Sequence, residues 1–341
     1  MTDLKQALKV LSELDGISGR EETVRDFILA QLKQSPAEPQ ITVDHLGNIL
    51  CTLRGQNRPK KTLMLAAHMD EVGLIITSIR QDGFLHFSPV GGIDTGVLLG
   101  RRVRIGEQRG VIGCKAVHLC SKKEKEKLPD VADLLIDIGA NSLEEAEKLV
   151  SPGDVAAFDM DFSEMQDLVR GKALDDRAGC ALLLSLAASV PLYDITLAFT
   201  VQEEVGLRGA GPAAFAIQPD IAVIVDATTA ADSADVPPEK QVCRVGFGPV
   251  VSFMDKSTLY DHDLYRQIRT LADDAGISNQ TKTTVAGGND AGAIQRTAGG
   301  VRVAAVSLPC RYIHSPSCVL SMQDMCDTET LLNKLIEVLP E

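Results

Sequence analysis

The architecture of this chain is most directly inferred from the segment Thr200-Val201-Gln202-Glu203-Glu204-Val205-Gly206. It follows the apolar run Ile195 to Phe199, which predicts a buried strand, and Gly206 predicts the turn that ends it. Open α/β sheets place their sites at the carboxyl ends of such strands. A lone pair of glutamates is more often a solvated strand end. Its meaning therefore depends on what the other strands of the chain carry at their ends.

Histidine and acidic residues stand at the ends of several other apolar runs. The run Lys61 to Ala67 is nearly continuous, as expected for an interior strand, and leads into His68. The run Ile221 to Val225 leads into Asp226. Elements of one α/β sheet would bring such ends together along one edge. The residues that share this position are His68, Asp175 or Asp176, Glu203, Glu204, Asp226 and His314.

Two imidazoles and several carboxylates form a ligand set that suits Zn²⁺, Co²⁺ or Mn²⁺. Five ligands are too many for one open catalytic zinc, but they suit two metals about 3.5–4 Å apart that share one carboxylate. Such a pair would lower the pKa of a bridging water and polarise the carbonyl that this water attacks. Asp70, two residues beyond His68, would accept its other ring N–H and fix its tautomer. A carboxylate outside the ligand set would serve as general base.

Each of these residues also has a purely structural explanation. A histidine at a strand end can be hydrogen-bonded without binding a metal, and the pair Asp175 and Asp176 can cap a helix. Asp290, flanked by glycines, can be a turn residue. The joint placement of five candidates at five element ends favours the metal site.

The sequence changes character between Val72 and Asp161. Short apolar segments alternate there with glycines and charges, which predicts a small β-rich unit. Because α/β texture precedes and follows it, we predict an inserted domain over residues 72–161 and a discontinuous catalytic domain over residues 1–71 and 162–341. Within the insert, the charge run Ser121 to Lys127 predicts a solvated loop.

Two helices are predicted before the first strands. Apolar residues at helical spacing from Leu4 to Leu14 predict a helix that stops near Gly16. Ser18 and Glu21 have the Ser-x-x-Glu spacing of a capping box, which predicts that Ser18 caps the second helix.

Composition narrows the partners and the location. The chain has 341 residues, of which 45% are hydrophobic, and its net charge of −13 disfavours nucleic acid and anionic membranes as partners. The eight cysteines include no Cys-x-x-Cys pair, which indicates reduced thiols and argues against a structural thiolate zinc site. No apolar run approaches the ~18–20 residues that span a bilayer, and Met1 to Leu8 lacks the features of a secretory signal. We therefore expect a cytoplasmic protein.

Four segments resemble motifs of the M42 family of metallo-aminopeptidases, which includes glutamyl aminopeptidases and tetrahedral TET peptidases. They are Ala67 to Gly73 (AHMDEVG), Ala173 to Cys180 (ALDDRAGC), Val201 to Ala210 (VQEEVGLRGA) and Arg311 to Pro316 (RYIHSP). The similarity runs over essentially the whole chain and includes Gly110 to Gly113 and Leu135 to Ala140 in the insert. It implies a mixed-sheet α/β/α metallopeptidase domain of the phosphorylase/hydrolase-like type. It also implies a PDZ-like dimerisation insert and a dodecamer built from dimers.

The resemblance also implies a role for each site residue. His68 and Asp226 would bind one metal, Glu204 and His314 the other, and Asp175 would bridge them. Family resemblance selects Asp175 over Asp176 as the bridge, a choice that spacing leaves open.

By the same resemblance, Glu203 would be the general base and Asp70 would orient His68. Two departures from the family pattern are visible, Asn289 in place of a common Thr and Gln295 in place of a common His. Neither is an expected ligand, so they bear on substrate preference.

The leading prediction is a hydrolase, a dinuclear metal-dependent aminopeptidase that removes residues from peptides with a free N-terminus. A non-catalytic metal-binding or assembly protein is the first alternative. The second is an endoglucanase, which needs two carboxylates about 5–9.5 Å apart across a sugar and has no use for two histidines. In addition, Glu203 and Glu204 on a regular strand would point to opposite faces.

The sequence leaves the native metal and the preferred N-terminal side chain open. Lys256 and Arg208 are candidates to favour acidic residues, although exposed positions are more usual for such side chains.

Overall fold

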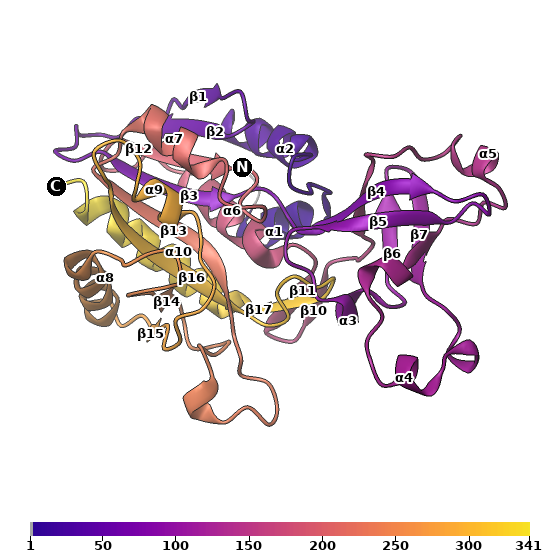
Figure 1. Cartoon of the computed structure of the whole chain (residues 1–341). Coiled ribbons are helices and arrows are strands. Elements are labelled where there is room, and N and C mark those ends of the chain that lie inside the picture. Colours follow the sequence, from indigo (N-terminus) through magenta and orange to yellow (C-terminus); the bar gives the residue numbers. More distant parts are fainter. Residues whose placement is uncertain (1–2) are drawn as a thin grey trace.

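The computed structural model describes residues 3–341, so Met1 and Thr2 of the predicted catalytic domain lie outside the described residues. An eight-stranded mixed sheet forms the centre of the larger lobe (Figure 1). In spatial order its strands are β1 (Gln40–Val43), β2 (Ile49–Leu53), β12 (Ile195–Thr200), β3 (Leu63–His68), β13 (Ile221–Thr229), β16 (Arg302–Cys310), β14 (Val250–Val251) and β15 (Gln280–Thr281). The four strands β12, β3, β13 and β16 are parallel, while β2 and β14 run antiparallel to the outer two of them.

Alternation along β3 explains why the sheet is covered on both faces. Leu63, Leu65 and Ala67 belong to one hydrophobic core and Met64 and Ala66 to another. Successive strand residues point to opposite faces, so a continuous apolar run requires a covering layer on each side. All six residues of β3 are buried, which confirms the predicted interior strand.

Helices supply the two covering layers of the α/β/α sandwich. The larger core joins the sheet to α1 (Leu4–Glu13), α2 (Glu22–Leu32), α6 (Leu174–Leu186), α8 (His262–Asp274) and α10 (Met322–Val338). The smaller core joins the opposite face to α7 (Ala210–Ile217) and α9 (Ala291–Ile294). Within residues 3–341, no helix combines the length and the apolarity needed to cross a membrane.

A closed β-barrel projects from the larger lobe, at the right of Figure 1. Its strands, in order around the barrel, are β4 (Gly73–Ile79), β5 (Leu85–Val90), β8 (Leu135–Asp137), β7 (Gln108–Gly113), β6 (Arg102–Ile105) and β9 (Val155–Phe158). Three short α-helices accompany them, α3 (Thr95–Leu98), α4 (Lys122–Lys125) and α5 (Leu143–Ala146). The barrel has its own core, which includes Leu74, Phe87 and Ile136. A β-rich unit is thus inserted into the α/β chain, and its exact boundaries remain a prediction.

A small sheet lies at the junction of the two lobes. It consists of β10 (Ser163–Met165), β11 (Leu168–Gly171) and β17 (Cys318–Ser321), all antiparallel. It therefore pairs the segment that returns from the barrel with the segment that follows β16.

The predicted capping box at Ser18 is wrong. Glu21 is the N-cap residue of α2 and makes no side-chain capping bond, while the Ser18 hydroxyl donates to the Asp70 carboxylate at 2.6 Å. A fully buried carboxylate requires donors, and this requirement outweighs a local cap that water could replace. A capping box does form between Ser121 and Glu124, so the exposed charge run contains one turn of helix, α4.

Three buried charges join the end of β3 to the helical layer. The ammonium group of Lys172 lies 2.6 Å from the Glu71 carboxylate and also donates to the carbonyl of Leu14 at 2.8 Å. Arg177 approaches the same carboxylate at 3.3 Å and donates to the carbonyl of Met69 at 2.8 Å. Lys172, Glu71 and Arg177 are each at most 3% exposed. This ion cluster fixes the chain reversal that follows β3.

Replacing Lys172 with Met should destabilise the protein strongly. The substitution keeps the length of the side chain but leaves the buried Glu71 carboxylate with one cation, and loss of a partner in a buried ion pair costs about 3–5 kcal/mol. The free energy of unfolding in urea, followed by circular dichroism at one protein concentration, measures the effect. The control is Arg80→Met, which breaks the exposed Arg80 to Asp82 pair and should change little. Equal effects of the two substitutions would refute the structural importance of the cluster.

Candidate metal centre

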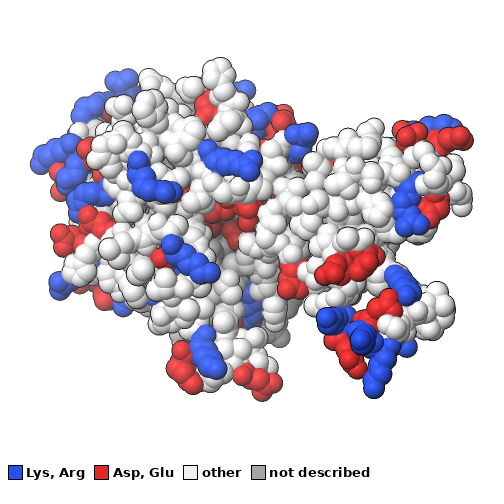
Figure 2. Space-filling view, in the orientation of Figure 1, with Lys and Arg blue, Asp and Glu red and all other residues white. Residues whose placement is uncertain are grey.

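The structure brings the predicted site residues together at the carboxyl edge of the parallel strands. His68 is the last residue of β3, and Asp226 lies within β13, three residues before its end. Asp175 lies in the first turn of α6, and His314 lies between β16 and β17. Figure 2 shows Asp and Glu side chains gathered in the recess where the larger lobe meets the barrel.

Two groups of three side chains have the spacing of metal ligands, and Asp175 belongs to both. His68, Asp175 and Asp226 form one group, and Asp175, Glu204 and His314 form the other. In each group the potential ligand atoms lie within 4.8 Å of one another. The Nε2 atoms of His68 and His314 lie 3.2 Å and 3.6 Å from different oxygens of Asp175.

The structure separates Asp175 from Asp176, which sequence spacing could not do. Asp175 lies between the two imidazoles, with 12% of its side chain exposed. Asp176 is fully buried and accepts from the backbone N–H groups of His68 at 3.2 Å and Gly179 at 2.9 Å. The Asp176 carboxylate therefore holds the end of β3 against the start of α6. Asp175 is therefore the residue available to bridge two ions.

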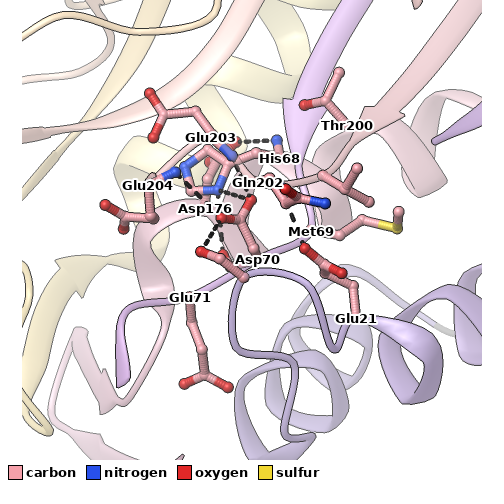
Figure 3. Close-up of polar contacts among 12 residues, drawn as sticks. Glu21, His68, Met69, Asp70, Glu71, Asp176, Thr200, Gln202, Glu203 and Glu204 are labelled. Carbon is pink, nitrogen blue, oxygen red and sulfur yellow. Dashed lines mark hydrogen bonds and ion pairs between the residues drawn. The ribbon is translucent and has the colours of Figure 1, made fainter. Parts of the chain in front are cut away.

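Asp70 connects His68 to the segment that carries Glu203 and Glu204 (Figure 3). It is fully buried, and its carboxylate lies 3.4 Å from Nδ1 of His68. The same carboxylate accepts from the backbone N–H groups of Glu203 at 3.0 Å and Glu204 at 3.1 Å, and from the Ser18 hydroxyl. It thus positions the segment that carries both glutamates, in addition to the predicted contact with His68.

Glu203 and Glu204 lie in a turn, so the prediction that they point to opposite strand faces is wrong. β12 ends at Thr200, and Gln202 has a φ of 56°, in the left-handed region. The hydrogen bonds to Asp70 hold this turn in place and replace the strand ladder. Both glutamates consequently line one cavity of about 280 Å³, together with His68 and His314.

The orientation of His314 depends on the inserted unit. His314 has a φ of 60°, and its Nδ1 lies 2.7 Å from the carbonyl oxygen of Gly92, which follows β5 of the barrel. If Nδ1 donates to that carbonyl, Nε2 is left unprotonated and faces Glu204 at 3.2 Å. The neighbouring residue Gly91 has a φ of +84°, and a side chain there would contact Val72 at 2.7 Å.

The charges of the site fit a bound cation. Burial and the charge of Asp175 raise the pKa of Asp226 well above its usual range. Burial likewise raises the pKa of Glu203, with further contributions from Asp290 and Asp226. Burial lowers the pKa of His68, yet its hydrogen bonds to Asp175 and Asp70 outweigh this and raise it well above the usual range. Closely spaced carboxylates beside imidazoles thus form a strongly negative cluster, which divalent metals with nitrogen and oxygen ligands would neutralise.

Asp290 is buried rather than being an exposed turn residue. It accepts from the Thr200 hydroxyl at 2.6 Å, and burial raises its pKa to about 6. It does not belong to either ligand group among the described residues.

Several residues of the site carry a misleading sequence signal or none. The spacing of Ser18 and Glu21 indicates a helix cap, whereas the Ser18 hydroxyl donates to Asp70. Gly92, whose carbonyl contacts His314, lies far from His314 in the sequence, and no sequence pattern predicts that contact. Lys282 also lines the cavity, whereas Lys256 and Arg208, named from the sequence, do not.

The sequence matches the family model described as M42 glutamyl aminopeptidase over residues 47–331. It is 40% identical to a provisionally named aminopeptidase from Acetivibrio thermocellus, over 98% of both chains. It is 32% identical to a lysyl aminopeptidase from Pyrococcus furiosus, over 98% of this chain and 97% of the relative.

Two solved structures extend this similarity to the fold. A TET aminopeptidase from the marine sediment archaeon Thaumarchaeota archaeon SCGC AB-539-E09 superimposes with a TM-score of 0.93 at 33% identity, over 98% and 96% of the two chains. The TET1 peptidase of Pyrococcus horikoshii, described as assembling into a tetrahedron or a large octahedral shell, gives 0.85 at 36% identity, over 98% and 99%. Matches of this extent and identity show that the chain belongs to the M42 family of metallo-aminopeptidases.

Proposed function

We propose that the protein is a dinuclear aminopeptidase that removes N-terminal residues from peptides with a free amino group. The observation that carries this proposal is the pair of ligand groups that share Asp175 beside a cavity also lined by Glu203. Relatives named as aminopeptidases support the reaction class.

Five residues would hold the metals. His68 and Asp226 would bind one ion, Glu204 and His314 the other, and Asp175 both. Zn²⁺ and Co²⁺ fit this nitrogen and oxygen set, and Mn²⁺ is also compatible. When bound, two such ions lower the pKa of a bridging water and polarise the carbonyl of the substrate.

Glu203 is the proposed general base. It lines the cavity and, among residues 3–341, its carboxylate is in neither ligand group and takes part in no ion pair, whereas Glu204 faces His314. Burial raises the pKa of Glu203, which makes its carboxylate a better proton acceptor. It would take the proton from the attacking water and deliver it to the leaving amine. Asp70 would keep Glu203 in place, because its carboxylate accepts from the backbone N–H of Glu203.

The alternatives are not favoured. An endoglucanase has no use for two imidazoles within the carboxylate cluster, and a non-catalytic relative would be expected to lack a ligand or the base. The described site contains all five candidate ligands and Glu203. The absence of a Cys-x-x-Cys pair among the eight cysteines supports a cytoplasmic location as a proposal.

The barrel would mediate self-association, first into dimers and then into a dodecamer. The large assemblies of the TET1 relative support this proposal, and so do apolar side chains exposed on the barrel, with Val117 72% and Leu119 62% exposed.

Leu119→Glu should therefore lower the molar mass measured by light scattering, because it introduces a charge into an apolar contact. Leu46→Glu, at an exposed leucine of the larger lobe, is the control and should leave the mass unchanged. A monomeric wild-type protein would contradict the proposal.

Asp175→Asn should reduce the bound metal below two ions per chain, because it removes the charge shared by both sites. Asp176→Asn should retain two ions, since its amide oxygen can still accept from the backbone of His68 or Gly179. Metal analysis after dialysis, with circular dichroism to confirm folding, measures both. Metal loss confined to Asp176→Asn would reverse the assignment.

The proposed activity is tested by removing metal with a chelator and restoring Zn²⁺, Co²⁺ or Mn²⁺ separately. We expect cleavage of aminoacyl anilides after restoration and none of their N-acetylated forms, because an aminopeptidase acts only on substrates with a free N-terminal amine. Glu203→Gln should bind the same metal but lose about 10²–10⁴-fold in kcat, the usual contribution of a general base.

Full activity of Glu203→Gln would refute its role. Cleavage of the acetylated substrates would refute an aminopeptidase. No cleavage with two ions bound, across a broad peptide panel, would favour the non-catalytic alternative.

A further inference from the structure

Two cysteines flank the hairpin that carries His314. Cys310 is the last residue of β16, and Cys318 is the first residue of β17. Next to them, Arg311 and Val319 pair in antiparallel orientation, with backbone hydrogen bonds of 2.9 Å and 3.0 Å. Because neighbouring residues of an extended chain point to opposite faces, both cysteines lie on the face opposite Arg311 and Val319.

The two thiols are buried and in contact. Cys310 is 0% exposed and Cys318 is 1% exposed, and the thiols are hydrogen-bonded to one another. Both side chains belong to the larger hydrophobic core. Cysteines whose side chains already face each other can form a disulfide without a large movement of the backbone. Such a bond would enclose residues 311–317, with His314 at their centre.

The Cys318 thiol supports the turn on both sides of His314. Its sulfur lies 3.5 Å from the carbonyl oxygens of Tyr312 and Ser315, so one S–H is shared between them. Tyr312 and His314 have φ values of 59° and 60°, in the left-handed region. Residues other than glycine keep this conformation only where their surroundings hold it. A disulfide has no S–H, so its formation would remove this donor from the turn.

A small oxidant can reach Cys318 through the candidate metal centre. Cys318 lines a cavity of about 10 Å³ together with Asp175, Glu204 and His314. These three residues also line the main cavity, so the two cavities adjoin there. The smaller cavity has room for about one water molecule. This route favours an oxidant as small as hydrogen peroxide over larger ones.

We propose that Cys310 and Cys318 form a disulfide when the protein meets peroxide, and that this bond weakens metal binding by His314. The Cys318 sulfur takes one oxygen of the peroxide and becomes a sulfenic acid, while the O–O bond breaks and the other oxygen leaves as water with the thiol proton. The Cys310 thiol then attacks the Cys318 sulfur and releases a second water. The two thiols are oxidised and the peroxide is reduced. The effect on metal rests on the proposed function, whereas the disulfide itself does not.

The disulfide is tested on the Zn²⁺-restored enzyme, because Zn²⁺ takes no part in redox reactions. Trypsin cleaves after Arg311, so the bond would join the peptide that ends there to the peptide that begins at Tyr312. After peroxide and digestion without reductant, we expect this joined peptide in the mass spectrum and its loss with dithiothreitol. Cys326→Ser removes the other cysteine of the second peptide and serves as the background. Cys310→Ser in that background should give no joined peptide.

Zn²⁺ affinity tests the link to His314. In the oxidised protein one of the two ions should bind about 10- to 100-fold more weakly, the usual cost of losing a group that orients a ligand, and dithiothreitol should reverse this. Cys318→Ala should bind that ion as weakly without peroxide, because it removes the same donor. Cys318→Ser should keep both ions and resist peroxide, since its hydroxyl can donate to the same carbonyl groups.

The wild-type protein decides the matter even if a variant does not fold. No joined peptide, at a peroxide dose that oxidises the exposed Cys114, overturns the disulfide. A joined peptide with unchanged Zn²⁺ affinity overturns the link to His314. Anilide cleavage before peroxide is measured in parallel, and its absence would overturn the proposed function, which neither the peptide nor the Zn²⁺ measurement tests.

Discussion

The buried carboxylate of Glu71, held by Lys172 and Arg177, is the interaction on which the site depends. Arg177 also donates to the carbonyl groups of Leu11 and Met69, so one side chain joins α1, the end of β3 and α6. Burying such charges is costly, and the arrangement is stable only because nearly every donor and acceptor is matched. Its effect is to fix where β3 ends and in which direction the chain turns.

Asp70 transmits this constraint to the candidate metal centre. Glu71 and Asp70 are adjacent, and their side chains extend in different directions, as Figure 3 shows. Glu71 is held by Lys172, which precedes α6, and by Arg177 of α6, whereas Asp70 is held by Ser18 and the backbone of Glu203 and Glu204. The proposed base and one proposed ligand therefore share a single support. A rigid support of this kind keeps catalytic groups in place without a regular strand.

The barrel also contributes to this centre. The Gly92 carbonyl orients His314, and the adjacent Gly91, with a φ of +84°, has no room for a side chain beside Val72. The position of the barrel is therefore part of the geometry of the second ligand group. If the barrel mediates assembly, as proposed, the surface that joins subunits and the group that orients a ligand belong to one folded unit.

Local sequence patterns were sufficient to predict much of the fold and to select the candidate site residues. The continuous apolar run of β3 requires burial on both faces, and the glycine-rich texture after Val72 indicates the β-rich insert. The residue types at the strand ends identified His68, Glu203 and Asp226, because parallel strands of one sheet end at the same edge.

Other features depend on contacts between segments far apart in the chain, for which sequence periodicity carries no signal. Ser18 donates to Asp70 instead of capping α2, Asp176 is occupied by backbone donors, and Lys282 reaches the cavity while Lys256 does not. A side chain with several possible partners takes the one that satisfies a buried charge, and only the folded arrangement shows which charge that is.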